Sequence, residues 1–322
     1  MSTTAAEAGL VTISPGPAAA DDRGRVRFAV PATPRPLSPA SADRPEIGRL
    51  ELRVAVRDQR SVAAHQYHQG ALRVLRPHYL DDSGQVCYVL VNPGGAYLGA
   101  DLFVLDVEVG DGAKLLLTTQ SATKVYRTPG SFAEQRMRLR LGEGSQLELA
   151  PDQLIAYREA SYRQNTHITV RPSSSLVMAE VVTPGWSPDG ESFRYEKLRL
   201  RTEIHVEVAG QTQLLALDNV LIRPSGNDVT GMGFMEGFSH LGSLIVVDAR
   251  VDQALADELH HVTAAHDAYT GVSLTAPVAG TAGLVLRSLS NSTGELNRLL
   301  GACTTLLRDR WYGQAPLNLR KY

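Results

Sequence analysis

Polar side chains interrupt an apolar strand at residues 118–126 of this 322-residue chain. Polar groups at strand positions need hydrogen-bond partners if they are buried. Their concentration in one place predicts an internal polar network, a channel wall or a contact with another protein. The side chains concerned are those of Thr118, Thr119, Gln120, Thr123, Lys124 and Tyr126.

Two carboxylates are singled out by their positions in the sequence. Asp101 follows a segment whose glycines, among them Gly94 and Gly95, allow unusual backbone angles. Glu180 interrupts the apolar run LVMAEVV, where an unpaired buried carboxylate would be costly. We expect Glu180 to contact an ion, a water or a partner, and a salt bridge to an arginine is the simpler alternative. Lys124 would order a carboxylate, since a protonated amine cannot coordinate a metal.

Motifs of the common enzyme classes are missing from the sequence. There is no P-loop, Gly231-Met232-Gly233 lacks a third glycine at dinucleotide-loop spacing, and the segment around Ser239 does not complete G-x-S-x-G. The histidines lack zincin spacing and there is no CxxC, so neither a closed metal site nor a tightly bound cofactor is predicted. A divalent-ion surface near His65 and His68 is an alternative to a solvated loop.

Composition narrows the class of protein further. The 32 basic and 34 acidic residues nearly balance, so neither a nucleic-acid footprint nor a polybasic membrane patch is predicted. No run of 18 apolar residues and no secretory signal pattern is found, and Cys87 and Cys303 lie far apart. We therefore expect a cytoplasmic protein with reduced thiols.

Strand patterns dominate residues 46–322, which we interpret as one domain. Residues 1–45 are rich in Ala and Pro and are predicted to be a disordered extension, with a strand at 26–30 as the alternative. Strands are predicted from period-two alternation and turn residues. Their expected ranges are 50–56, 71–76, 85–91, 102–109, 113–119, 136–141, 145–150, 166–171, 175–182, 193–208, 213–222 and 243–248.

Three hairpin-like units recur at steps of 32 and 29 residues, marked by the small pairs Gly112-Ala113, Gly144-Ser145 and Ser173-Ser174. Such recurrence favours stacked layers, as in a solenoid or β-helix, although any large antiparallel protein has similar hairpins. The predicted fold is therefore mostly β, with stacked strand layers.

Helical periodicity follows at 252–266 and 292–310, and the second segment opens with a capping-like Ser292-x-x-Glu295. The apolar faces of these helices and the GMGFMEGF turn at 231–238 are candidate docking surfaces. The alternative is that both helices pack on their own sheet.

The stretch that contains the polar run reads Asn92-Pro93-Gly94-Gly95, then Asp101, then Thr118-Thr119-Gln120 with Lys124 and Tyr126. It resembles the signature of the urease accessory proteins of the UreD family, called UreH in some species. Residues 149–157 and Gly190-Glu191-x-Phe193 resemble further family segments, and the likeness covers about 50–320. The acid of Asp152-Gln153 is displaced by one place and Trp186 replaces an arginine, which is typical of a divergent member.

The resemblance implies a urease maturation factor that is not an enzyme. Such a scaffold or metallochaperone would join a UreF-like helical protein and a UreG-like GTPase on the urease apoprotein, and Ni²⁺ would pass transiently through an internal polar tunnel. The candidate carboxylates that would meet the ion are Asp101, which matches the acid of the family's G-D-x-L motif, and Glu180. The alternative is a structural adaptor without metal transit. Transit is favoured if Asp101, Gln120 and Lys124 line an internal cavity, and the adaptor if they face solvent. The residues expected on the polar path or the interface are Gly94, Gly95, Thr119, Gln120, Lys124, Tyr126 and Asp152.

We predict that the purified protein hydrolyses neither GTP nor urea, because the sequence has no P-loop and no cluster of metal-binding histidines. Phosphate release and ammonia release from a rigorously purified preparation measure this, and sustained turnover of either substrate would contradict it.

Overall fold

The computed structural model describes residues 19–20, 26–27, 44–226 and 228–319. The chain divides into two compact units, Met1–Asp43 and Arg44–Tyr322. In the first unit, strands β1 (Ala19–Ala20) and β2 (Val26–Arg27) pair in antiparallel fashion. The strand considered at 26–30 thus begins with β2, whereas the disorder predicted for residues 1–45 falls almost entirely on positions outside the described residues.

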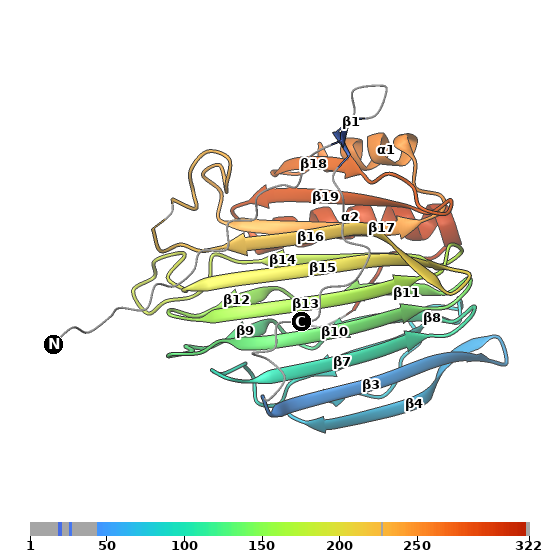
Figure 1. Ribbon diagram of the computed structural model, residues 1–322, viewed down its shortest axis with the longest axis horizontal. Coiled ribbons are helices and arrows are strands. Elements are labelled where there is room, and N and C mark those ends of the chain that lie inside the picture. Colours follow the sequence, from blue (N-terminus) through green and yellow to red (C-terminus); the bar gives the residue numbers. More distant parts are fainter. Residues whose placement is uncertain (1–18, 21–25, 28–43, 227, 320–322) are drawn as a thin grey trace. The chain divides into compact units, whose positions relative to one another are not determined.

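The second unit is built from two sheets through which the chain passes in turn (Figure 1). The first sheet contains, in spatial order, β16 (Gln211–Ile222), β15 (Lys197–Val208), β13 (Ser161–Val170), β10 (Ala133–Leu141), β7 (Leu102–Val109), β3 (Glu46–Arg57) and β4 (Arg60–Gly70). The second contains β18 (Tyr269–Leu274), β19 (Ala282–Ser290), β17 (His240–Asp248), β14 (Ser175–Val182), β11 (Gln146–Ala150), β8 (Lys114–Thr119), β6 (Val86–Val91) and β5 (Arg73–Val74), with the short β12 (Leu154–Ala156) and β9 (Thr123–Val125) alongside.

Successive coils stack in parallel. In the second sheet, Leu115 pairs with Leu147 and Leu147 with Leu176, so the coils are offset by 32 and 29 residues. These are the steps at which the small-residue pairs recur in the sequence. The prediction of a mostly β, solenoid-like fold with two helices is confirmed.

A single apolar interior fills the space between the sheets. Along β10, Met137, Leu139 and Leu141 are buried there while Arg138 is exposed, as the alternation of this segment predicts. Strand β15 begins at Lys197, so the strand expected at 193–208 is four residues shorter, because Phe193 and its neighbours form a loop.

Two helices cover the outer face of the second sheet. Helices α1 (Gln253–Thr263) and α2 (Thr293–Tyr312) are capped by Asp252 and by the predicted Ser292, which accept hydrogen bonds from Leu255 N and Glu295 N. Their apolar faces form a second core with β14, β17 and β19. The helices therefore pack on their own sheet, and the docking surface predicted on their apolar faces is not available.

A buried ion pair fixes the end of α2 to the second sheet. Arg308 and Glu148 are each 2% exposed, and Arg308 Nη1 lies 2.5 Å from Glu148 Oε1. Gln85 donates to the same carboxylate at 2.8 Å, and Arg308 Nε donates to the carbonyl of Ala315 at 2.8 Å. Removal of one member would leave the other charge buried and uncompensated.

We predict that Arg308→Met lowers the free energy of unfolding by about 3–5 kcal/mol, since Glu148 keeps its buried charge. Urea denaturation measures the loss, and adding Glu148→Gln should restore part of it. Arg310→Met is the matched control on the same helix, because its pair with Glu258 is exposed and should contribute at most about 1 kcal/mol. Equal losses in the two arginine variants would contradict the prediction.

Candidate functional site

The second sheet has a gap beside the middle of β14. Strand β11 pairs with β14 as far as Leu149, opposite Met178, and β12 resumes the pairing at Leu154, opposite Val182. The preceding coil breaks at the same level, because β8 ends at Thr119 and β9 begins at Thr123. Residues 179–181 of β14 consequently have no strand partner on this side.

Polar groups replace part of the lost strand pairing at this gap. Thr118 Oγ1 donates to the carbonyl of Ala150 at 2.6 Å, and Asp152 N donates to Thr119 Oγ1 at 2.9 Å. The amide of Thr123 donates to the carbonyl of Gln153 at 3.0 Å. Threonines in the polar run thus satisfy backbone groups that a continuous ladder would have paired.

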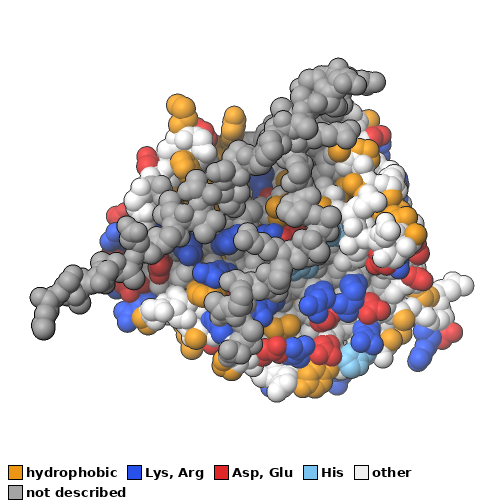
Figure 2. Space-filling view, in the orientation of Figure 1, with side chains coloured by type: hydrophobic (Ala, Val, Ile, Leu, Met, Phe, Trp, Pro, Cys, Tyr) orange, Lys and Arg blue, Asp and Glu red, His pale blue; other side chains and the backbone are white. Residues whose placement is uncertain are grey.

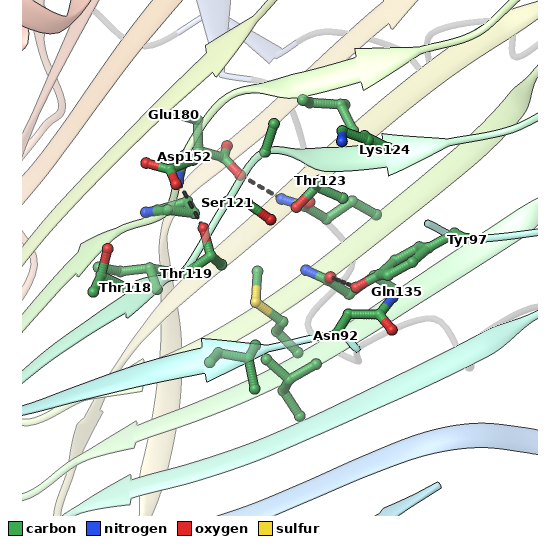
Figure 3. A pocket seen from close by; sticks show the side chains of 18 of the residues that line it. Asn92, Tyr97, Thr118, Thr119, Ser121, Thr123, Lys124, Gln135, Asp152 and Glu180 are labelled. Carbon is green, nitrogen blue, oxygen red and sulfur yellow. Dashed lines mark hydrogen bonds between the residues drawn. The ribbon is translucent and has the colours of Figure 1, made fainter. Parts of the chain in front are cut away.

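A cavity of about 80 Å³ lies between the sheets at this gap (Figure 3). Apolar side chains of both sheets form much of its wall, including Leu105, Met137 and Leu149. Its polar lining comes from the glycine-rich segment, the polar run, the loop after β11 and inward positions of three strands: Asn92, Tyr97, Thr118, Thr119, Ser121, Thr123, Lys124, Gln135, Asp152, Gln164 and Glu180.

Two glutamines carry polar groups into the apolar interior. Tyr97 donates its hydroxyl hydrogen to Gln135 Oε1 at 2.6 Å, and Gln164 Nε2 donates to Glu180 Oε1 at 2.5 Å (Figure 3). The sequence analysis missed both glutamines. A signal was present, because Gln135 is in phase with Met137 on β10 and Gln164 is in phase with Ile168 on β13.

Glu180 lies on the inward side of β14. Burial raises the pKa of its carboxyl group, whereas the hydrogen bond from Gln164 and the charge of Arg287 act in the opposite direction. The hydrogen-bond partner of Glu180 is thus the side-chain amide of Gln164. The nearby Arg287 forms its ion pair with Asp218, so the salt bridge considered as the simpler alternative is not formed with this arginine. Glu180 is therefore a half-buried carboxylate whose hydrogen-bond partner is neutral.

A hollow on the outer face of the second sheet adjoins the gap. This hollow, of about 420 Å³, is lined by Arg298 and Thr304 of α2 and also by Asp152 and Glu180. The same two carboxylate residues line the inner cavity. A second outer hollow, of about 530 Å³, shares Thr118 with the inner cavity and is bordered by Arg308.

Asp101 is not in the wall of the inner cavity. Its Oδ2 accepts a hydrogen bond of 2.7 Å from Leu98 N, which closes the turn after Tyr97. Burial and the charge of Asp101 together raise the pKa of Tyr97. The structure therefore separates Asp101 from Glu180 and gives it a local role in the turn that brings Tyr97 to the cavity.

The remaining predicted residues divide between the cavity and the surface. Lys124, Thr119, Asp152 and Gly95 line the cavity, and Gly95 adopts a φ of +77° in the turn after Asn92. Three others are exposed and lie outside its wall: Gly94, Gln120 and Tyr126. Of the three residues chosen to distinguish transit from an adaptor, only Lys124 faces the cavity.

The chemistry of the gap is that of scattered oxygen donors. In the described part of the chain, no three His, Cys, Asp or Glu side chains gather closely enough to hold a metal ion. Carboxylate, hydroxyl and amide groups nevertheless line the inner cavity, and the carboxylates of Asp152 and Glu180 line the outer hollow as well. Such ligands bind a divalent cation weakly and in series. Within the same described residues, no helix is long and apolar enough to cross a membrane.

Comparisons with known proteins agree on one family. The family model described as UreD urease accessory protein matches residues 46–321. The urease accessory protein UreD of Arthrobacter sp. (strain FB24) is 85% identical over 86% of this chain and 94% of its own length. The UreD proteins of Corynebacterium glutamicum (strain ATCC 13032) and Bacillus cereus (strain ATCC 10987) are 48% and 33% identical, over 84% and 85% of this chain and 97% and 98% of their own lengths.

We predict that Glu180 makes the protein less stable as pH rises. Because its pKa is raised on folding, the folded state binds the proton more tightly than the unfolded state. Stability is therefore lost between the ordinary pKa of glutamate and the raised one. Urea denaturation of the wild type and Glu180→Gln across pH 4–8 should give a difference that shifts in favour of the variant as pH rises. The exposed Glu191→Gln is the control, and a pH-independent difference for Glu180→Gln would contradict the prediction.

Proposed function

The chain belongs to the UreD family of urease accessory proteins, and from this premise we propose that it passes nickel to apo-urease through the gap in its second sheet. In this proposal the protein acts as a maturation factor and scaffold, and does not catalyse a reaction. It joins a UreF-like helical protein and a UreG-like GTPase on the urease apoprotein. Nickel is the cargo and is not a resident cofactor.

One observation carries the proposal: Asp152 and Glu180 line both the outer hollow beside α2 and the cavity between the sheets. A cation that crosses the sheet at this level would pass both carboxylates. The strand partner that would close the sheet there is missing beside residues 179–181.

The environment of Glu180 suits brief binding better than storage. A buried carboxylate with one amide partner gains from a nearby cation, because the cation compensates the cost of burying its charge. The donors on the path are oxygens, and in the described part of the chain they do not form a closed cluster with histidine or cysteine. Weak serial sites let an ion leave each position, which a transfer path requires.

Lys124 and Asp101 take supporting roles in this proposal. Lys124 borders the cavity and would orient carboxylates, since its ammonium group has no lone pair for a metal. Asp101 orders the turn that carries Tyr97, and we retain it as a candidate nickel contact at the edge of the path.

A structural adaptor without metal transit is the second candidate. It is favoured by the exposure of Gln120 and Tyr126, since both belong to the polar run and neither lines the cavity. Tyr126 packs edge-to-face against Tyr157, with 4.7 Å between the ring centroids, as surface aromatic pairs do in interfaces. The two candidates differ in what the loss of the inner carboxylates does.

We predict that Asp152→Asn with Glu180→Gln lowers the nickel content and activity of urease by about tenfold or more while complex assembly persists. Both substitutions keep side-chain size and remove only the charge that would meet the ion. The measurement uses cells that express the urease subunits and all accessory proteins, with nickel counted per urease and assembly followed by co-purification.

Glu191→Gln serves as the matched control, because it removes an exposed carboxylate that lines neither the inner cavity nor the outer hollow. Full nickel loading in the double variant would remove these two residues from the path and favour the adaptor. Loss of assembly together with loading would make the residues structural.

A further inference from the structure

Crowded cations lie on the outer face of the first sheet. Arg163 on β13 lies directly opposite Arg199 on β15, and Lys197 is two residues away on the same strand and the same face. Figure 2 shows Lys and Arg side chains interspersed with Asp and Glu side chains on this face of the molecule. In the part of the chain that the structure describes, no ion pair to a carboxylate is formed by any of these three residues.

One carboxylate adjoins these cations: Glu134 on β10 lies directly opposite Arg163, but it forms its ion pairs with Arg44 and Arg136. Arg163 lies over the ring of Phe132 at 3.8 Å, and Arg199 Nε donates to Asn219 Oδ1 at 3.1 Å. Partial burial, followed by repulsion from Arg163, Arg223 and Arg199, lowers the pKa of Lys197. Like charges held this close destabilise the free protein and would be relieved by an anionic partner.

Strand β16 carries exposed apolar side chains next to these cations. Leu221, opposite Arg199, is 50% exposed, and Leu217, opposite Glu203, is 54% exposed. A hollow of about 350 Å³ continues from Leu221 to Phe234 in the loop after β16. Apolar residues beside arginine are the composition of energetically important protein interfaces.

The loop at 228–238 holds its apolar side chains out to solvent in a defined shape. Met232 is 90% exposed and Phe234 is 61% exposed. Asp228 Oδ1 accepts hydrogen bonds from the amide and the hydroxyl of Thr230, at 3.1 and 2.7 Å, and Gly233 N donates to Glu236 Oε1 at 2.6 Å. Because the loop is ordered by its own contacts, a partner would bind it without a large entropic cost.

From these observations we infer that the outer face of β15 and β16, together with the loop at 228–238, is a docking surface for an acidic face of the urease apoprotein. The partner's surface would place carboxylates against Arg163, Lys197 and Arg199 and an apolar groove around Met232 and Phe234. This inference rests on the proposed function for the identity of the partner, and on charge and exposed apolar area for the location.

The test measures binding of the purified full-length chain to purified nickel-free urease apoprotein at low and high salt. Reversal of charge in Lys197→Glu with Arg199→Glu should weaken binding about tenfold or more and reduce its salt dependence. Met232→Ser with Phe234→Ser should weaken binding to a similar extent at both salt concentrations. Lys197→Gln with Arg199→Gln gives a milder second variant if the reversed pair fails to fold.

Arg57→Glu is the matched control, since it reverses one exposed charge at the end of β3, near the opposite edge of the same sheet. It should change binding less than twofold, and no variant should unfold below the wild-type temperature. If both double variants bind apo-urease as the wild type does, the docking surface is overturned. It is also overturned if the substitutions weaken binding only to another accessory protein or to anionic vesicles, and not to apo-urease. A wild-type chain that neither binds apo-urease nor supports its activation would instead contradict the proposed function.

Discussion

The parallel register between coils is the constraint on which the rest of this structure depends. Each strand alternates between an apolar interior and an outer face, so a slip of one residue would turn Met137 and Leu139 outward and Arg138 inward. Offsets of 32 and 29 residues therefore hold in both sheets, as the pairs Phe103–Gln135 and Leu147–Leu176 illustrate. Because neighbouring coils pair in fixed parallel register, a break in one coil lies level with the corresponding residues of the next. The breaks after β8 and β11 consequently lie at the same level and form one gap.

A gap in a sheet wall is tolerated only where its backbone groups find other partners. The hydroxyl groups of Thr118 and Thr119 supply two of these, which explains why a polar run interrupts an apolar strand. Because threonine hydroxyl groups replace part of the strand pairing, their oxygen atoms lie along the gap. The residues that satisfy the backbone there therefore also supply oxygen ligands for a cation. Glu180 is a different case, because no backbone group needs its carboxylate and burial penalises its charge. Its presence points to function more strongly than the threonines do.

Local pattern predicted much of the fold but little of the site. The alternation of β10, the recurrence of small turns and the cap at Ser292 are set by neighbouring residues, and all were read correctly. Strand β4 was missed because its exposed edge reads RSVAAHQYHQG, without alternation between apolar and polar residues. The pair Arg308–Glu148 joins residues far apart in sequence, and no local signal relates them. The gap likewise depends on the register of three coils, so the polar run was recognised as unusual while the place it opens onto was not.

The outer faces of the two sheets differ in what packs against them, so a scaffold could use each face for a different partner. The second sheet carries α1 and α2, and the gap opens there into a hollow bordered by α2. The first sheet has no helix against its outer face among the described residues, and this face carries Arg163, Lys197 and Arg199. A partner that delivers nickel beside α2 and a client that binds the cationic face would therefore not compete for the same surface. The interior shared by both sheets then lies between donor and client, which is the position that a transfer path across the protein requires.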